Sequence, residues 1–206
     1  MTSSEHPALP GAWSDHQADQ YLRQWGQVPL HDRVAELAGI RAGDRVLDIG
    51  CGGGHLARLL AALGAQVTGV DPTPRMVEQA RAQSQNLAQA PEFLEASAER
   101  LPLDDDGLDL ALAVCSLHHW QDLAAGLAEV RRVLRPGGRL VIIEENWAEL
   151  LPELGEQFPG ASPEDFPVLD MARLACQLRD AGLAPGQPGD YRAPGIAVHL
   201  LTATKE

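Results

Sequence analysis

Basic residues are scarce in this chain. Its 16 Lys and Arg are outnumbered by 29 Asp and Glu, which gives a formal net charge of -13. Nucleic-acid affinity comes mainly from Lys and Arg that neutralise phosphates, so we expect no nucleic-acid partner. Four arginines do cluster, but at the end of an expected helix, where positive charge complements the helix dipole. They are Arg131, Arg132, Arg135 and Arg139.

Cysteines and long apolar segments are also few. The three cysteines, Cys51, Cys115 and Cys176, are widely spaced and contain no C-x-x-C pair, so neither a disulfide framework nor a cysteine metal site is expected. No apolar run approaches the roughly 18 residues that span a bilayer. The N-terminal segment lacks the basic and then apolar pattern of a signal peptide. These absences predict a cytoplasmic protein without a membrane span.

The remaining composition is typical of one globular domain. The 206 residues are 45% hydrophobic and 22% charged, and short apolar runs alternate with segments of helical periodicity. This alternation indicates a mostly parallel sheet with helices on both faces. Seven strands are expected, at 45–49, 66–70, 92–95, 108–114, 139–144, around Tyr191 and at 196–204, and the last two form an antiparallel edge hairpin because a tight turn joins them. Helices are expected at 15–26, 30–39, 54–63, 74–84, 122–134 and 165–181.

Glycines concentrate between the first expected strand and the next helix, where residues 46–56 read VLDIGCGGGHL. Because glycine has no side chain, a ligand can lie against the backbone N–H groups at a helix N-terminus. The same loop satisfies a permissive dinucleotide fingerprint, with Asp71 placed as a ribose-binding acid. Asp48, however, would oppose a pyrophosphate and would suit an ammonium group. The loop therefore favours a nucleoside with a cationic amino-acid arm.

Three further segments extend this pattern. Residues 97–110 read SAERLPLDDDGLDL, residues 116–120 read SLHHW, and residues 129–140 read EVRRVLRPGGRL. Together with the glycine loop, they resemble the class I S-adenosylmethionine-dependent methyltransferases, in the small-molecule branch similar to ubiquinone and menaquinone biosynthesis methyltransferases (methyltransferase type 11). The resemblance covers about residues 45–144. It implies a Rossmann-like fold, S-adenosylmethionine as cofactor, S-adenosylhomocysteine as product, and methyl transfer to a small-molecule acceptor.

The resemblance also implies cofactor contacts. Asp48 would orient the ammonium group through water, and Asp71 would accept the ribose hydroxyls. The family usually has aspartate where this chain has Ser97, which can still accept a hydrogen bond from the adenine amino group. Asp71 could instead cap the following helix, and Glu99 could be a surface acid. The implied cofactor-binding residues are Asp48, Gly50, Cys51, Gly52, Gly54, Asp71, Pro72, Met76, Ser97, Ala98, Glu99, Cys115 and Ser116.

The acceptor is expected beyond the carboxyl ends of the strands, where ligands of open α/β sheets bind. His118 and His119 follow the fourth strand and are the candidate catalytic bases, because imidazole titrates near neutral pH. No metal is expected, since adjacent histidines point apart and no third ligand is apparent. Four aromatic residues are the candidate substrate contacts, although the first three could merely anchor the N-terminal segment: Tyr21, Trp25, Trp120 and Trp147.

The expected organisation is one domain, with an N-terminal helical lid over residues 1–40 and the S-adenosylmethionine-binding part over 41–206. Residues 144–170 hold eight acids and no Lys or Arg, which predicts an acidic excursion from the sheet at about 145–165. These acids favour a neutral or cationic acceptor, or simply keep the segment solvated. The alternatives are a catalytically idle S-adenosylmethionine-binding regulatory module, a nicotinamide-dependent dehydrogenase, and an RNA or protein methyltransferase. The acceptor's identity and the oligomeric state are not predicted.

Overall fold

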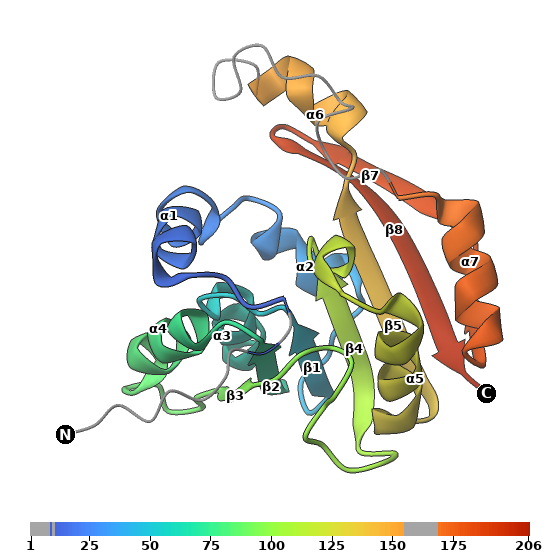
Figure 1. The fold of residues 1–206 in the computed structure, drawn as a ribbon, viewed down its shortest axis with the longest axis horizontal. Helices are drawn as coiled ribbons and strands as arrows, with labels where there is room; N and C mark the ends of the chain where they lie inside the picture. Colours follow the sequence, from blue (N-terminus) through green and yellow to red (C-terminus); the bar gives the residue numbers. More distant parts are fainter. Residues whose placement is uncertain (1–8, 10, 155–168) are drawn as a thin grey trace.

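The computed structural model describes residues 9, 11–154 and 169–206, and Figure 1 shows a twisted sheet with helices on both sides. Its strands are β1 (Arg45–Ile49), β2 (Gln66–Asp71), β3 (Glu92–Glu95), β4 (Leu108–Val114), β5 (Leu134–Glu145), β6 (Leu183–Pro185), β7 (Gly189–Ala193) and β8 (Ile196–Lys205). Its helices are α1 (Asp15–Trp25), α2 (His31–Leu37), α3 (His55–Ala62), α4 (Pro74–Ser84), the 3₁₀ helix η1 (Leu117–His119), α5 (Leu123–Val133), α6 (Trp147–Leu154) and α7 (Met171–Asp180).

The strands form one mixed sheet in the order β3-β2-β1-β4-β5-β8-β6, with β7 also paired to β8. The first five strands in this order are parallel, and β8 is antiparallel to β5, β6 and β7. The strand order reverses direction between β1 and β4. Ligands of open α/β sheets bind at this switch point, so the carboxyl ends of β1 and β4 are where a site is expected.

Alternate residues of the central strands enter two hydrophobic cores. On β1, Leu47 and Ile49 pack in the first core, and Val46 packs in the second. Residues of α5 and α7 close the first core, whereas residues of α2, α3 and α4 close the second. Burial on both faces is the reason these strands read as nearly continuous apolar runs.

The predicted fold class is confirmed, with differences in detail. The sheet has eight strands rather than seven because the short β6 pairs with the end of β8. β5 begins at Leu134, which pairs with Leu108 before the register shifts, so the strand starts earlier than expected. The helix expected over 165–181 is described from Met171 onward, and residues 165–168 lie outside the described part.

The N-terminal region divides into two parts. Residues 1–8 and 10 of the expected lid lie outside the described part, and α1 lies beside α3 and α4 (Figure 1). α2 is instead part of the second core, where Val34 is fully buried. The expected acidic excursion at about 145–165 includes α6, and its residues from 155 onward lie outside the described part. None of the helices in the described part is long and apolar enough to cross a membrane.

Candidate functional site

Two adjoining hollows open at the carboxyl ends of β1, β2 and β4. We name them after one aspartate in each. The Asp71 hollow has a volume of about 80 Å³ and is lined by Gly11, Trp13, Tyr21, Ile49, Gly50, Gly52, Asp71, Pro72, Thr73, Met76, Ala96, Ser97, Ala98, Glu99, Cys115, Ser116, His119, Trp120 and Gln121. The Asp48 hollow has a volume of about 290 Å³ and is lined by Trp13, Tyr21, Trp25, Gly26, Val28, His31, Asp48, Gly50, Cys51, Gly52, Gly53, His55, Leu56, Val114, Cys115, His118, His119, Glu145 and Trp147.

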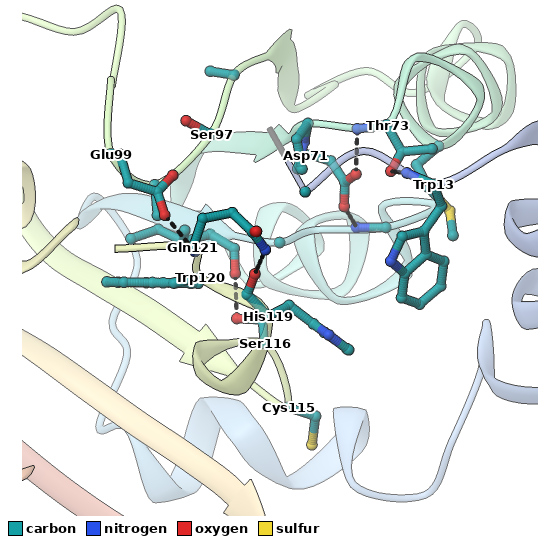
Figure 2. Close-up of a pocket in the computed structure, with 18 of the residues that line it drawn as sticks. Trp13, Asp71, Thr73, Ser97, Glu99, Cys115, Ser116, His119, Trp120 and Gln121 are labelled. Carbon is teal, nitrogen blue, oxygen red and sulfur yellow. Dashed lines mark hydrogen bonds between the residues drawn. The ribbon is translucent and has the colours of Figure 1, made fainter. Parts of the chain in front are cut away.

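Asp71 ends β2 and holds the glycine loop in place. Its Oδ2 accepts a hydrogen bond from the Gly52 N–H at 3.0 Å, and its Oδ1 accepts one from the Thr73 N–H at 2.9 Å (Figure 2). Burial raises the pKa of Asp71, and these N–H groups partly oppose the increase. Thr73 is the N-cap of α4, so the hydrogen bonds of Asp71 do not reach that helix's first turn. Its alternative assignment as a helix cap is therefore not supported.

The glycines of the loop have different roles. A Cβ at Gly50 would lie 2.6 Å from the Ser116 Cβ, and a Cβ at Gly54 would lie 2.6 Å from the Phe93 Cζ. Both positions therefore require glycine for close packing between elements. Gly54 lines neither hollow, although it was predicted to bind the cofactor. A Cβ at Gly52 would meet nothing closer than 4.0 Å, so the space beside Gly52 is open.

Asp48 lies at the base of its hollow with an unpartnered oxygen. Its side chain is buried, and Oδ2 has no hydrogen-bond partner among the described residues. Burial and the nearby charge of Asp71 raise the pKa of Asp48 to about 7. A buried carboxylate without a partner is costly, because it has lost its hydration and gained no compensating contact. Asp48 is therefore suited to a cationic ligand group.

We expect Asp48→Asn to stabilise the protein more at pH 8 than at pH 5. The raised pKa means that folded Asp48 binds a proton that the unfolded chain has released. Stability therefore falls as pH rises from about 4 to about 7. The neutral amide avoids this loss, so its effect on the free energy of unfolding should be roughly 2 kcal/mol more favourable at pH 8 than at pH 5. Urea denaturation at both pH values measures this difference. Asp104→Asn, in an exposed loop, is the control. Equal effects of Asp48→Asn at both pH values would contradict the raised pKa of Asp48.

His118 is paired with Glu144, a residue to which the sequence alone assigned no role. Glu144 ends up beside η1 because Val114 of β4 pairs with Ile143 of β5. Its Oε1 accepts hydrogen bonds from the N–H groups of Ser116 and Leu117 at 2.9 and 2.8 Å. Its Oε2 lies 2.6 Å from the His118 Nδ1. These contacts fix both the carboxylate and the imidazole.

The two histidines of the pair respond differently to their surroundings. Burial lowers the pKa of His118, but the hydrogen bond and charge of Glu144 outweigh it and raise the pKa overall. Burial and the neighbouring His118 lower the pKa of His119. His118 therefore has the stronger affinity for a proton and a partner that stabilises its charged form, as a general base requires.

His118, Glu144 and Glu145 also offer ligand atoms within 4.8 Å of one another. The two acids come from β5, far from His118 in the sequence, so no third ligand was apparent from the sequence alone. The oxygens of Glu144 already accept hydrogen bonds from two backbone N–H groups and contact His118. This arrangement favours proton handling over metal binding.

Ser97, Ala98 and Glu99 line the Asp71 hollow. Figure 2 shows Ser97 and Glu99 on the side opposite Asp71 and Thr73. Glu99 is more than a surface acid, because its Oε1 accepts hydrogen bonds from the N–H groups of Gln121 and Asp122 at 2.8 and 3.1 Å. These bonds connect the loop after β3 to the start of α5. Glu99 therefore helps to shape one wall of this hollow.

The predicted substrate residues separate into two groups. Tyr21, Trp25 and Trp147 line the Asp48 hollow. Trp120 lines only the Asp71 hollow, where it packs so closely on α5 that a Cβ at Gly126 would lie 2.4 Å from its ring. The buried Nε1 of Trp120 has no hydrogen-bond partner in the described part of the chain. Trp120 thus lies with the predicted adenine contacts, apart from Trp25 and Trp147.

The N-terminal segment covers both hollows. The Trp13 N–H donates a hydrogen bond to the Thr73 Oγ1 at 3.1 Å, and the Trp13 ring makes edge contacts with Tyr21 and His119 at centroid distances of 5.2 and 5.3 Å. An ion pair between Asp19 and Arg75 at 2.9 Å connects α1 to α4. These contacts place Trp13 and Tyr21 over the glycine loop, as a lid would require.

Several lining residues were not predicted from the sequence. They include Thr73, Gln121, Val28, His31 and His55. A signal existed for three of them, because Thr73, Gln121 and His55 directly follow predicted site residues in the sequence. Val28 and His31 come from the segment before β1, whose placement depends on tertiary packing.

Comparisons with known proteins find a matching family and similar enzymes. Residues 47–142 match a family described as a methyltransferase domain. The chain is 34% identical over 193 residues to the 27-O-demethylrifamycin SV methyltransferase of Amycolatopsis mediterranei, a match that covers 87% of this chain and 67% of that enzyme. It is 35% identical over 193 residues to the ubiquinone biosynthesis O-methyltransferase of Xanthomonas axonopodis, covering 85% of this chain and 77% of that enzyme. The chain spans less than half the length of some other curated relatives.

A solved structure supports the fold. The crystal structure of a SAM-dependent methyltransferase from Aquifex aeolicus aligns with 94% of this chain and 100% of its own, with a TM-score of 0.72 and 21% identity. At this identity the likeness concerns the fold alone. The residues of the hollows must therefore be interpreted from their own chemistry.

Proposed function

Because the chain belongs to the methyltransferase domain family, whose small-molecule enzymes use S-adenosylmethionine, we propose that it transfers the methyl group of this cofactor to a small acceptor in the Asp48 hollow. The observation that carries the proposal is the unpartnered oxygen of Asp48 beside a glycine loop that Asp71 holds open. Asp48 supplies the negative charge that an ammonium group needs. Asp71 supplies carboxylate oxygens at the end of β2 for ribose hydroxyls. A cytoplasmic location and the absence of a nucleic-acid partner remain predictions from the sequence.

The residues that line the Asp71 hollow have the chemistry to bind the adenosine part of the cofactor. Pro72 and Met76 offer apolar surface, Ser97 offers a hydroxyl, and the Nε1 of Trp120 offers an unpartnered donor. Cys115 and Ser116 contribute to the wall shared with the Asp48 hollow. Bound S-adenosylmethionine supplies a methyl group on a positively charged sulfur, which is already strongly electrophilic. The residues of the site therefore act mainly by holding the methyl donor and the methyl acceptor in line.

His118 is assigned the role of accepting the proton that the acceptor loses. Support comes from its 2.6 Å contact with Glu144 and from its position in the Asp48 hollow. Glu144 orients the ring through Nδ1, which leaves Nε2 to face the acceptor, and stabilises the imidazolium that forms. His119 contacts the Trp13 ring instead, so we assign it the role of holding the N-terminal lid in place.

A neutral or cationic acceptor is favoured. No Lys or Arg lines the Asp48 hollow in the described part of the chain, whereas the acid Glu145 does, together with the aromatic rings of Trp25 and Trp147. Acids repel an anionic acceptor, and aromatic faces accommodate apolar or cationic groups. The similarity to enzymes named for rifamycin and ubiquinone O-methylation supports a hydroxyl as the accepting group.

A transfer assay tests the proposed function. The protein is incubated with S-adenosylmethionine labelled in its methyl group and with a panel of matched phenols, amines and dicarboxylates. We expect labelled product from neutral or cationic acceptors and reduced turnover in Trp147→Ala. Turnover confined to multiply anionic acceptors would contradict the acceptor class. Cofactor binding without transfer to any member of a broad panel would favour the idle binding module.

We expect Ser97 to accept a hydrogen bond from the adenine amino group. Ser97→Asp should maintain or increase affinity for S-adenosylhomocysteine, because a carboxylate accepts the same hydrogen bond. Ser97→Leu should weaken it by about fivefold or more, because the adenine amino group loses its partner. Calorimetric titration of both variants measures the effect. Wild-type affinity in Ser97→Leu would show that this residue does not contact the adenine.

A further inference from the structure

The Asp48 hollow contains a pair of histidines that the proposed reaction does not use. His31 is the first residue of α2, and His55 is the first residue of α3. Their ring centroids lie 5.3 Å apart, and both rings line the hollow. They come from the helices that close the second core, whereas His118 and His119 come from η1. The hollow therefore has imidazoles from two separate parts of the fold.

Among the described residues, no Arg or Lys lines the Asp48 hollow beside these histidines. Arg58, one turn along α3, donates hydrogen bonds to the Gly53 carbonyl at 2.8 Å and to the Gln83 Oε1 at 2.7 Å. It does not line the Asp48 hollow, and neither does any other Arg or Lys of the described residues. An anionic ligand group that enters between α2 and α3 would therefore meet imidazoles.

Both rings can donate hydrogen bonds without being charged. Burial and the neighbouring His55 lower the pKa of His31 to about 4, and burial also lowers the pKa of His55. The Val28 N–H donates to the His31 Nδ1 at 3.4 Å, so the proton of the neutral His31 ring lies on Nε2. In addition, the N-cap residue of α3 is Gly54, which provides no side-chain cap for the N–H groups of the first turn. All of these donors suit a carboxylate.

We propose that His31 and His55 bind the carboxylate of the cofactor's amino-acid arm, while Asp48 binds its ammonium group. This assignment rests on the proposed function. An amino-acid arm carries both charges on one carbon, and the Asp48 hollow offers an unpartnered acid and two imidazole donors on its walls. The pair replaces the Arg or Lys that a carboxylate would otherwise attract.

Two probes isolate the carboxylate. S-adenosylhomocysteine has it, and the decarboxylated analogue keeps the adenosine, the sulfur and the amine. Calorimetric titration of the intact protein should show tighter binding of S-adenosylhomocysteine than of the analogue. His31→Phe and His55→Phe should each weaken the binding of S-adenosylhomocysteine by about tenfold, which corresponds to the loss of one hydrogen bond to a charged group. The affinity for the analogue should stay within about twofold of the wild-type value. His16→Phe, an exposed histidine of α1 outside both hollows, is the matched control.

The outcomes separate this assignment from the proposed function. Unchanged affinity for S-adenosylhomocysteine in both variants would overturn the assignment, as would an equal loss for both probes, which would indicate only structural support of the hollow. If His31→Phe does not fold, His55→Ala at the helix end gives the same comparison. Failure of the wild-type protein to bind either probe would instead reject the proposed cofactor.

Discussion

We expect Gly52→Leu to abolish detectable binding of S-adenosylhomocysteine and to leave the protein folded. Gly52 lines both hollows, and a Cβ there would have no neighbour closer than the Met76 Sδ and the Tyr21 Cε1, both at 4.0 Å. A leucine side chain would therefore extend into the space that the ligand needs. Calorimetry measures the binding, and circular dichroism verifies the fold.

The backbone conformation of Gly52 requires a matched control. Gly52 has a φ of +51°, so any side chain adds strain there. Gly43 has a φ of +89°, a Cβ there would have no atom within 4 Å, and the residue lies outside both hollows. Gly43→Leu should lose some stability and keep wild-type affinity. Equal affinities in the two variants would show that the ligand does not pass beside Gly52.

His118→Ala should reduce the rate of methyl transfer by about 10²–10⁴-fold, the usual contribution of general-base catalysis. Affinity for S-adenosylhomocysteine should change little, because the proposed role of His118 is to accept a proton from the acceptor and not to hold the cofactor. In the wild-type protein, kcat/KM should rise with pH, since only the neutral imidazole accepts a proton. The midpoint should lie above the ordinary pKa of histidine, because Glu144 raises the pKa of His118.

Glu144→Gln tests the origin of that midpoint. The amide can still accept hydrogen bonds from Ser116 and Leu117, but its lost negative charge should lower the pKa of His118. The midpoint of the pH–rate profile should therefore move to lower pH. A profile that does not move, or a His118→Ala enzyme with wild-type kcat, would remove the pair from catalysis.

The sequence was sufficient to predict the sheet because its signals are local. Apolar runs such as 108–114 and glycine breaks such as that at Gly64 mark each element directly. β6 has three residues and no alternation, and it forms only because β8 extends far enough to pair with it. The early start of β5 likewise depends on pairing between Leu134 and Leu108. Such pairings leave no local pattern.

The site divides in the same way. The cofactor-binding residues follow strands and a glycine loop that can be located by motif, and all of them except Gly54 line a hollow. The His118–Glu144 contact depends on the register between β4 and β5, and the His31–His55 contact depends on the packing of α2 on α3. Both contacts join residues more than twenty positions apart. Neither contact can be predicted from a local sequence pattern, because only the fold brings these residues together.

Calorimetric titration of the wild-type protein with S-adenosylhomocysteine, and separately with NAD, tests the central claim most directly. We expect one binding site for S-adenosylhomocysteine in the micromolar range, about -8 kcal/mol, and no measurable binding of NAD. The first ligand places an ammonium group at Asp48, whereas the second would place a pyrophosphate near that acid. Binding of NAD with no binding of S-adenosylhomocysteine would contradict the assignment of both hollows.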